Sequence, residues 1–282
     1  MEGLPIIISL TVLLLWTASN SLVKKSLMGM ESGLVSLTLI SLGLIPIFLF
    51  LFLSGDFNIS WILLINGLFS GFFLATGYIL FYMGMGKESL SSVGVTLNLQ
   101  QVIVIFIGIF LLGEAGNYLE FMGIGMIIMG AILVSIRGTP IKKKFFMIAA
   151  LANISWGVYY IPLSESVMDY HISAMPLFLA RILGTTLILI FMELRFAQLV
   201  KVSSGRLSII VTIIAGLLDG TGNVFYAYSI QSGFFVLSGS IVAMIPATVA
   251  IVGFYIFKDK MTYLKFSGII LSIMGALTIS FL

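Results

Sequence analysis

Ten long apolar stretches constrain the fold of this chain more than any other feature of its sequence. A bilayer core of about 30 Å needs about 20 mostly apolar residues for each helix that crosses it. Stretches of that kind, separated by short charged or Gly/Pro-containing loops, cover residues 4–22, 33–53, 60–83, 90–112, 118–136, 145–164, 172–194, 207–230, 233–257 and 262–282. Only 9% of the residues are charged, against about a quarter in a soluble domain. We therefore predict an all-α membrane protein with ten transmembrane helices.

Residue types that are missing or rare exclude several kinds of chemistry. The chain has no cysteine, so it has neither a disulfide nor a thiolate nucleophile, and its one histidine, His171, cannot build a metal site from imidazoles. No Gly-rich phosphate loop ending in Lys-Ser/Thr occurs, which argues against ATP as the energy source. The N-terminus carries Glu2 in place of a basic region, so we expect a retained first helix. We predict no cofactor and no metal.

The second half of the chain repeats the first. Residues 71–135 align without a gap on residues 216–280, at a constant offset of 145. The positions that match are Gly71, Gly77, Gly108, Tyr118, Leu119, Phe121, Gly123, Gly130, Ala131 and Ser135, which fall on Gly216, Gly222, Gly253, Tyr263, Leu264, Phe266, Gly268, Gly275, Ala276 and Ser280. At offsets near 140, Trp16 meets Trp156 and Gly43 meets Gly184. We predict a five-helix repeat at 1–138 and a second at 139–282.

The positive charges predict that the two repeats are inverted. Five is an odd number of crossings, so the second repeat begins on the opposite side from the first. Basic loop residues favour the cytoplasm, and thirteen of the 14 Lys and Arg residues follow the first, third, fifth, seventh or ninth stretch. They are Lys24, Lys25, Lys87, Arg137, Lys142, Lys143, Lys144, Arg195, Lys201, Arg206, Lys258, Lys260 and Lys265. We predict a multi-pass cell-membrane protein with both termini outside the cytoplasm. Topology thus explains the basic residues, and no nucleic-acid partner is expected.

Two charged residues lie near the middle of apolar stretches, Arg181 in 172–194 and Asp219 in 207–230. A charge at the bilayer centre costs about 2.5–3.5 kcal/mol on insertion scales, so it needs a partner or a function. One reading is a structural ion pair. The other makes Asp219 a proton-coupled or amine-binding carboxylate, with Arg181 as its partner or as the anchor of a substrate carboxylate.

Polar and aromatic side chains recur at helical spacing within several of the stretches. They are Trp16, Asn20, Tyr78, Asn98, Gln101, Asn153, Trp156, Tyr160, Asn223 and Tyr226. Polar groups in hydrocarbon must form hydrogen bonds, so these residues face inward. Each one alone fits interhelical contacts worth under about 1–2 kcal/mol. Because they gather at one depth in both repeats, we predict that together with Arg181 and Asp219 they line a substrate pocket.

Glycine and proline positions add predictions about packing and gating. Gly67 with Gly71, and Gly216 with Gly220, lie four residues apart, a spacing that allows close helix approach. Pro246 lies in the middle of the 233–257 stretch, where it would free a backbone carbonyl and kink the helix. Packing is enough to explain the glycines, and Pro246 is a candidate gating residue.

The sequence resembles the ten-helix EamA branch of the drug/metabolite transporter superfamily. The resemblance rests on the duplicated unit, on LLLWTASNSLVKK with its counterpart ISWGVYY, and on IFIGIFLLGE followed by FMGIGMIIMGAILV. Pro246 and Glu114 match family positions, whereas Gln101 replaces the first-copy proline and Asp259 stands where Glu is usual. Membership implies a central cavity lined by the stretches at 4–22, 60–83, 90–112, 145–164, 207–230 and 233–257. Family members carry amino acids, nucleotide sugars, drugs and other small solutes, often outward.

These observations favour a secondary transporter that works by alternating access. A channel is the runner-up, but no filter-like loop or ring of like charge occurs. An enzyme is not predicted, since Asp219 has no second catalytic group beside it in the sequence. An amino acid or related metabolite is the favoured solute, and a neutral, sugar-like or drug solute is the alternative. Protons are a candidate coupling ion, the lipid bilayer is the expected surrounding, and a monomer or loose homodimer is expected.

Overall fold

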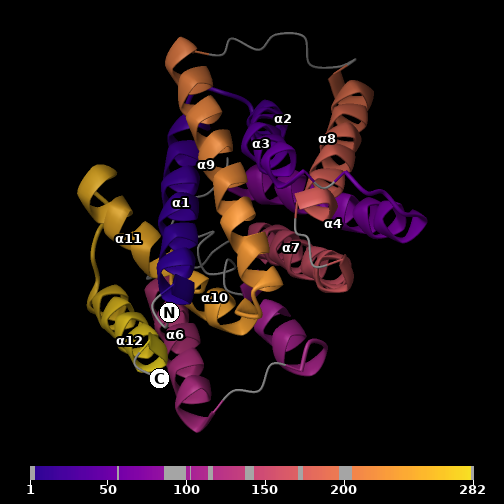
Figure 1. The fold of residues 1–282 in the computed structure, drawn as a ribbon. Helices are drawn as coiled ribbons and strands as arrows, with labels where there is room; N and C mark the ends of the chain where they lie inside the picture. The colour runs from indigo at the N-terminus through magenta and orange to yellow at the C-terminus, as the bar shows by residue number, and fades with distance from the viewer. Residues whose placement is uncertain are drawn as a thin grey trace.

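The structure is a computed structural model that describes residues 4–55, 57–85, 100–101, 103–113, 117–136, 143–170, 174–196 and 205–280. Within these ranges it consists of helices and short connections, without a β-strand (Figure 1). The helices are α1 (Leu4–Ser26), α2 (Ser32–Leu42), α3 (Leu44–Ser54), α4 (Trp61–Met85), α6 (Tyr118–Ser135), α7 (Lys143–Tyr170), α8 (Ala174–Phe196), α9 (Arg206–Gln231), α10 (Phe235–Val242), α11 (Ile245–Ile256) and α12 (Tyr263–Ser280). Residues 103–110 are also helical.

Six helical runs in the described part of the chain are long and apolar enough to cross a membrane. They are Leu4–Ser26, Ser32–Ser54, Trp61–Phe81, Ala174–Phe191, Arg206–Gln231 and Phe235–Ile256. Two shorter apolar helices, Tyr118–Val134 and Tyr263–Thr278, accompany them. Large apolar side chains cover the outside, including Leu53 at 74% exposure and Phe110 at 69%. A surface so rich in exposed apolar groups suits lipid contact.

Two of the predicted helices are interrupted. The 33–53 stretch forms α2 and α3 with a break at Gly43, and the 233–257 stretch forms α10 and α11 with a break at Ala243 and Met244. Pro246 therefore does not lie inside a helix as predicted, but in the first turn of α11. A first-turn residue needs no intrahelical N–H bond, so proline fits there without loss of a hydrogen bond.

Helices from different halves of the chain pack in matched pairs, α1 with α9, α4 with α7 and α6 with α12. In the last pair the helices cross at small residues, which bring backbone close to backbone. A Cβ on Gly130 would meet the Gly268 carbonyl, and one on Gly275 would meet the Gly123 carbonyl. Gly123 and Gly130 align on Gly268 and Gly275 in the repeat. The contact is therefore reciprocal between equivalent positions.

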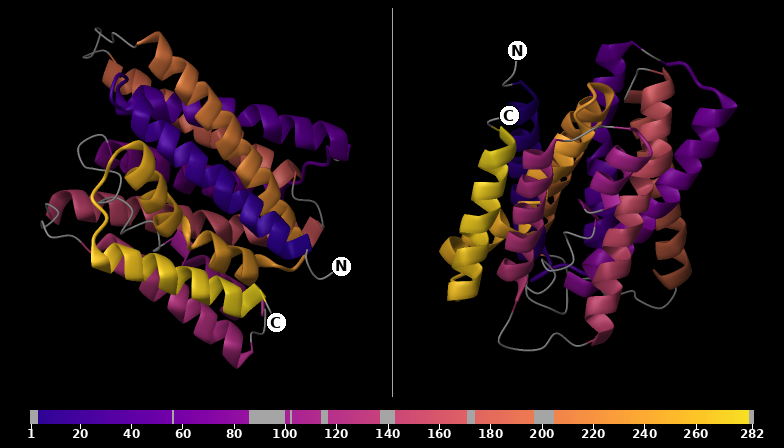
Figure 2. Two further views of the ribbon diagram at one scale, coloured as in Figure 1. Left: turned by 90° about the vertical axis from the view of Figure 1, so that its left-hand side faces the viewer. Right: turned by 90° about the horizontal axis from the view of Figure 1, so that it is seen from below.

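The glycines singled out in the sequence lie at close helix contacts. A Cβ on Gly71 would meet Ala180 and Gly184 on α8, and one on Gly220 would meet Gly43 between α2 and α3. The two further views show the start of α1 and the end of α12 on one side of the molecule (Figure 2). The largest apolar cluster of the described residues contains buried side chains from α1, α2, α4, α7, α8, α9 and α11, among other helices.

Candidate functional site

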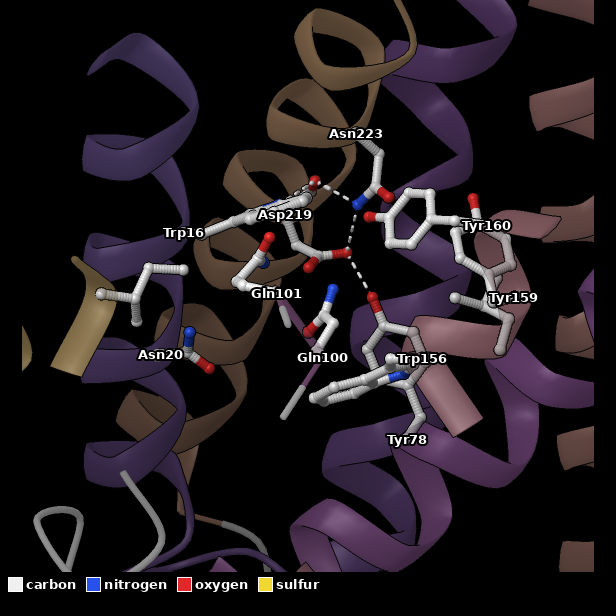
Figure 3. Close-up of a pocket in the computed structure, with 12 residues that line it drawn as sticks. Trp16, Asn20, Tyr78, Gln100, Gln101, Trp156, Tyr159, Tyr160, Asp219 and Asn223 are labelled. Carbon is white, nitrogen blue, oxygen red and sulfur yellow. Dashed lines mark hydrogen bonds between the residues drawn. The ribbon is translucent and has the colours of Figure 1, made fainter. Parts of the chain in front are cut away.

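A cavity of about 50 Å³ lies at the centre of the helix assembly (Figure 3). One water needs about 10–15 Å³ of such space, so the cavity holds a few waters or one small chemical group. Its lining comes from α1, α4, α7, α9, α11 and residues 100–101. The lining residues are Trp16, Asn20, Leu74, Tyr78, Gln100, Gln101, Trp156, Tyr159, Tyr160, Asp219, Asn223 and Ile245.

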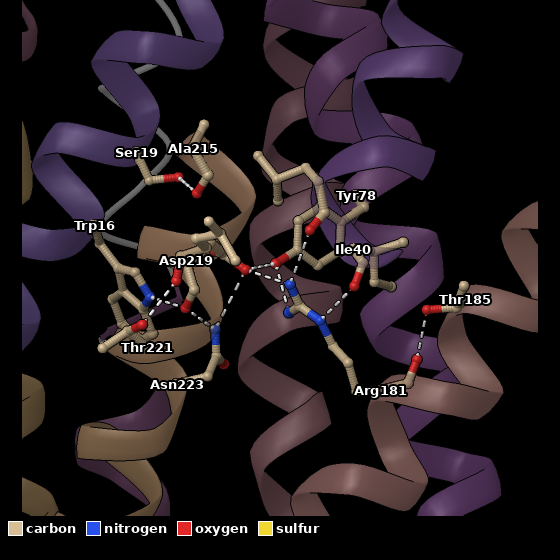
Figure 4. Close-up of polar contacts among 12 residues, drawn as sticks. Trp16, Ser19, Ile40, Tyr78, Arg181, Thr185, Ala215, Asp219, Thr221 and Asn223 are labelled. Carbon is tan, nitrogen blue, oxygen red and sulfur yellow. Dashed lines mark hydrogen bonds and ion pairs between the residues drawn. The ribbon is translucent and has the colours of Figure 1, made fainter. Parts of the chain in front are cut away.

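An ion pair lies at the edge of the cavity. Nη2 of Arg181 and Oδ2 of Asp219 are 2.5 Å apart (Figure 4). The hydroxyl of Tyr78 joins both groups, because it donates to Oδ2 of Asp219 at 2.5 Å and accepts from Nη1 of Arg181 at 2.9 Å. The guanidinium carbon also lies 5.2 Å from the centroid of the Tyr78 ring. Arg181 and Asp219 therefore bind each other in this structure, with Tyr78 from α4 between them.

The break at Gly43 supplies the other partners of Arg181. The helix α2 ends at Leu42, and Leu39 O near this end accepts from the backbone N–H of Gly43 at 3.0 Å. Arg181 donates to Ile40 O through Nε at 3.0 Å and to Leu39 O through Nη2 at 3.4 Å. Gly43 is required because a Cβ there would overlap the guanidinium.

The two carboxylate oxygens of Asp219 have different surroundings. Oδ2 accepts from Arg181 and Tyr78, and Asn223 Nδ2 lies 3.5 Å from it. Oδ1 has no hydrogen-bond partner in the part of the chain that the structure describes, and Figure 3 shows the carboxylate pointing into the cavity. The side chain is 13% exposed, whereas that of Arg181 is 1% exposed. The cavity therefore meets the carboxylate and not the guanidinium.

Aromatic rings form the remaining wall. The rings of Trp16 and Tyr226 lie 5.2 Å apart, and those of Trp156 and Phe81 lie 4.8 Å apart. Each indole packs where a helix of the other half has a glycine: a Cβ on Gly222 would meet Trp16, and one on Gly77 would meet Trp156. The indole N–H of Trp16 donates to the carbonyl of Asp219 at 3.3 Å. The two tryptophans thus face the cavity from opposite halves of the chain.

Three lining residues carry buried polar atoms without a hydrogen-bond partner in the described part of the structure. They are Gln101 Oε1, Trp156 Nε1 and Tyr159 OH. Buried polar groups in native proteins nearly always have a partner, which is water or a ligand when it is not protein. An acceptor and two groups able to donate are therefore available to a small polar molecule in the cavity.

Comparison with known proteins identifies the family. The EamA-like transporter family model matches residues 3–136 and again residues 143–281. The chain belongs to the EamA-like transporter family. Its members are membrane transporters of the drug/metabolite superfamily, so the apolar helices belong to a multi-pass membrane protein that acts on small solutes.

A solved structure has the same fold as this EamA-like chain. It is described as "Crystal structure of protein", with a TM-score of 0.74 and 16% sequence identity over 96% of this chain and 94% of that one. At that identity the likeness concerns the fold alone. No curated protein matches the sequence.

The cavity of this EamA-like protein brings together most of the residues predicted to bind substrate. Trp16, Asn20, Tyr78, Gln101, Trp156, Tyr160, Asp219 and Asn223 line it. Asn153, Arg181 and Tyr226 do not line it, because their side chains are buried among the surrounding helices. Pro246 follows the lining residue Ile245, and Asn98 lies outside the described residues.

Four lining residues were not predicted, namely Leu74, Gln100, Tyr159 and Ile245. Gln100 precedes Gln101, and Tyr159 precedes Tyr160. Side chains of adjacent residues in a helix point about 100° apart. A prediction from helical spacing therefore selected Gln101 and Tyr160 as lining residues and left out Gln100 and Tyr159. Both members of each pair line the cavity. Leu74 and Ile245 are apolar, and nothing in the sequence distinguishes them from other core residues.

Proposed function

We propose that this protein is a secondary transporter that moves a small polar metabolite outward by alternating access, an amino acid or related compound being the favoured solute. The observation that carries the proposal is the cavity, which has a carboxylate, amides and aromatic rings in the interior of an apolar helix assembly. Polar groups at such a place, between two halves of a chain, are typical of carriers.

The proposal includes ten membrane crossings arranged as two inverted repeats. Reciprocal contacts support it: Gly130 meets Gly268 as Gly275 meets Gly123, and Trp16 packs on Gly222 as Trp156 packs on Gly77. Contacts that exchange equivalent positions are expected about a pseudo-two-fold axis. Two halves related in this way have two similar arrangements available, one open to each side.

We also propose that both termini lie outside the cytoplasm. The start of α1 and the end of α12 lie on one side of the molecule (Figure 2). On the other side, the end of α1 carries Lys24 and Lys25 beside the start of α9 with Arg206, where Gly205 N donates to Gly29 O at 3.4 Å. Basic residues gathered on one side favour the cytoplasm for that side.

Counterflow in liposomes tests the carrier. Purified full-length protein is reconstituted into vesicles preloaded with one unlabelled amino acid at a time, and uptake of the labelled compound is measured with and without a pH gradient. A carrier gives transient accumulation above equilibrium, because exchange outpaces net loss, whereas a channel gives only equilibration. A pH gradient that raises the accumulation identifies protons as the coupling ion. Absence of flux for every amino acid rejects this solute class and leaves neutral, sugar-like and drug solutes to be tested.

A further inference from the structure

We propose that the cavity recognises its solute by a cationic ammonium group, which binds Oδ1 of Asp219, and that a carboxylate on the solute is not needed. The inference rests on the proposed function, since it takes the cavity as the solute site. It narrows the solute class to organic ammonium compounds, with amino acids included because of their amino group.

Arg181 is not available to a solute carboxylate. Its side chain is buried, and its nitrogens donate to Ile40 O, Leu39 O, Tyr78 and Asp219. It is also absent from the lining of the cavity. A carboxylate that enters the cavity would meet Asp219, which is the sole charged residue among the described lining residues. Two carboxylates at close range repel each other, so the site disfavours an isolated anion.

The charges around the ion pair leave the cavity side negative. Arg181 and Asp219 cancel as formal charges, but the guanidinium is also bound by the C-terminal carbonyls of α2. The carbonyl oxygens bind the guanidinium away from the cavity, and Oδ1 of Asp219, which has no partner among the described residues, faces the cavity. An ammonium group is the complement of that arrangement.

One further acceptor and several aromatic faces of the lining suit an ammonium group as well. Gln101 Oε1 is a buried acceptor with no partner among the described residues. Figure 3 shows Gln101 among the side chains that converge on the cavity with Asp219. The rings of Trp16, Tyr78 and Trp156 also border the space, and aromatic faces attract cations. One acceptor from an amide, one from a carboxylate and aromatic faces together satisfy an ammonium group.

A set of three matched compounds tests the inference by binding. Leucine, isopentylamine and 4-methylpentanoate share one apolar chain and carry both charged groups, only the ammonium, or only the carboxylate. Full-length protein in detergent is titrated with each at constant pH and ionic strength, and tryptophan fluorescence is followed, because Trp16 and Trp156 line the cavity. We expect isopentylamine and leucine to bind, and 4-methylpentanoate to bind at least about tenfold more weakly, a difference of about 1.4 kcal/mol.

Variants assign the binding to the residues. Asp219→Asn should weaken isopentylamine binding by at least about tenfold. If that variant fails to fold, Gln101→Leu provides the second test, with an expected loss of about threefold or more because one acceptor is removed. Thr221→Val is the matched control. Thr221 is on α9 near Asp219, but its hydroxyl donates to Leu217 O and it does not line the cavity, so affinity should not change.

The inference is overturned if 4-methylpentanoate binds as tightly as isopentylamine, if neither ammonium compound binds, or if a folded Gln101→Leu protein keeps full affinity for isopentylamine. Counterflow with the same compounds separates this failure from failure of the proposed function. Carriage of the carboxylate but not of the amine rejects ammonium recognition and leaves the transporter intact. Binding of the amine without counterflow of any compound rejects the transporter and leaves the ammonium site intact.

Discussion

The hydroxyl of Tyr78 donates to Oδ2 of Asp219 over 2.5 Å, although the two residues are 141 positions apart in the sequence. The same hydroxyl accepts from Nη1 of Arg181. This bond joins α4 of the first half to α8 and α9 of the second. A movement of α4 relative to α8 and α9 would therefore change the hydrogen bonds of the Tyr78 hydroxyl.

Tyr78→Phe should leave the protein folded and less stable. It removes a hydroxyl that has two charged partners, but the ion pair itself remains. Hydrogen bonds within membranes average about 0.6 kcal/mol and reach about 1.7 kcal/mol, so we expect a loss of about 1–2 kcal/mol, measured by thermal unfolding in detergent. Tyr159→Phe is the control, because the Tyr159 hydroxyl has no partner among the described residues. Equal losses in the two variants would contradict this account of the Tyr78 bond.

Arg181→Met should strongly reduce the yield of folded protein. Removal of one partner from a buried ion pair leaves a buried uncompensated charge and costs about 3–5 kcal/mol. The double variant Arg181→Met with Asp219→Leu should recover yield, since a buried pair replaced by apolar residues is often neutral, but it should not transport. The area of the monodisperse peak on size-exclusion chromatography measures the yield of folded protein. A double variant no better than Arg181→Met would show that the lost charge balance is not the cause.

Gly130→Ala should destabilise the contact between α6 and α12. A Cβ there would overlap backbone and side-chain atoms of Gly268 and Ser272, and overpacking of this kind costs about 1–3 kcal/mol. Gly125→Ala on the same helix is the control, because a Cβ there meets nothing within 4 Å and alanine favours a helix over glycine. The melting temperature should fall for Gly130→Ala alone, and a fall of equal size in both variants would count against the packing argument.

Gly77→Ala and Gly222→Ala should affect solute binding alike. In each case the new methyl group displaces a cavity-lining indole, Trp156 or Trp16. Both variants should shift the tryptophan emission. Both should also weaken solute affinity by about tenfold, which corresponds to about 1.4 kcal/mol of binding free energy. If only one of the two changes affinity, the tryptophans do not have equivalent roles.

A large part of the fold and of the site was predictable from patterns within the chain. The apolar stretches place most of the helices, since crossing length depends only on the run of residue types. Arg181 and Asp219 stood out because charges are costly in lipid. Helix breaks were harder to predict. Gly43 was identified only as a repeat position, and the contact of the Arg181 guanidinium with the carbonyls of Leu39 and Ile40 beside it lies between segments far apart in the sequence.

The sequence by itself determined the family, the helical membrane character and most of the residues that meet at the cavity, because each of these depends on residue type at a given spacing. Only the tertiary structure decided which charged group faces the cavity. Arg181 turns toward the carbonyl end of α2 and is buried, so of these two charged residues it is Asp219 that lines the cavity. That choice depends on where the end of another helix lies, and no local pattern around Arg181 or Asp219 encodes it.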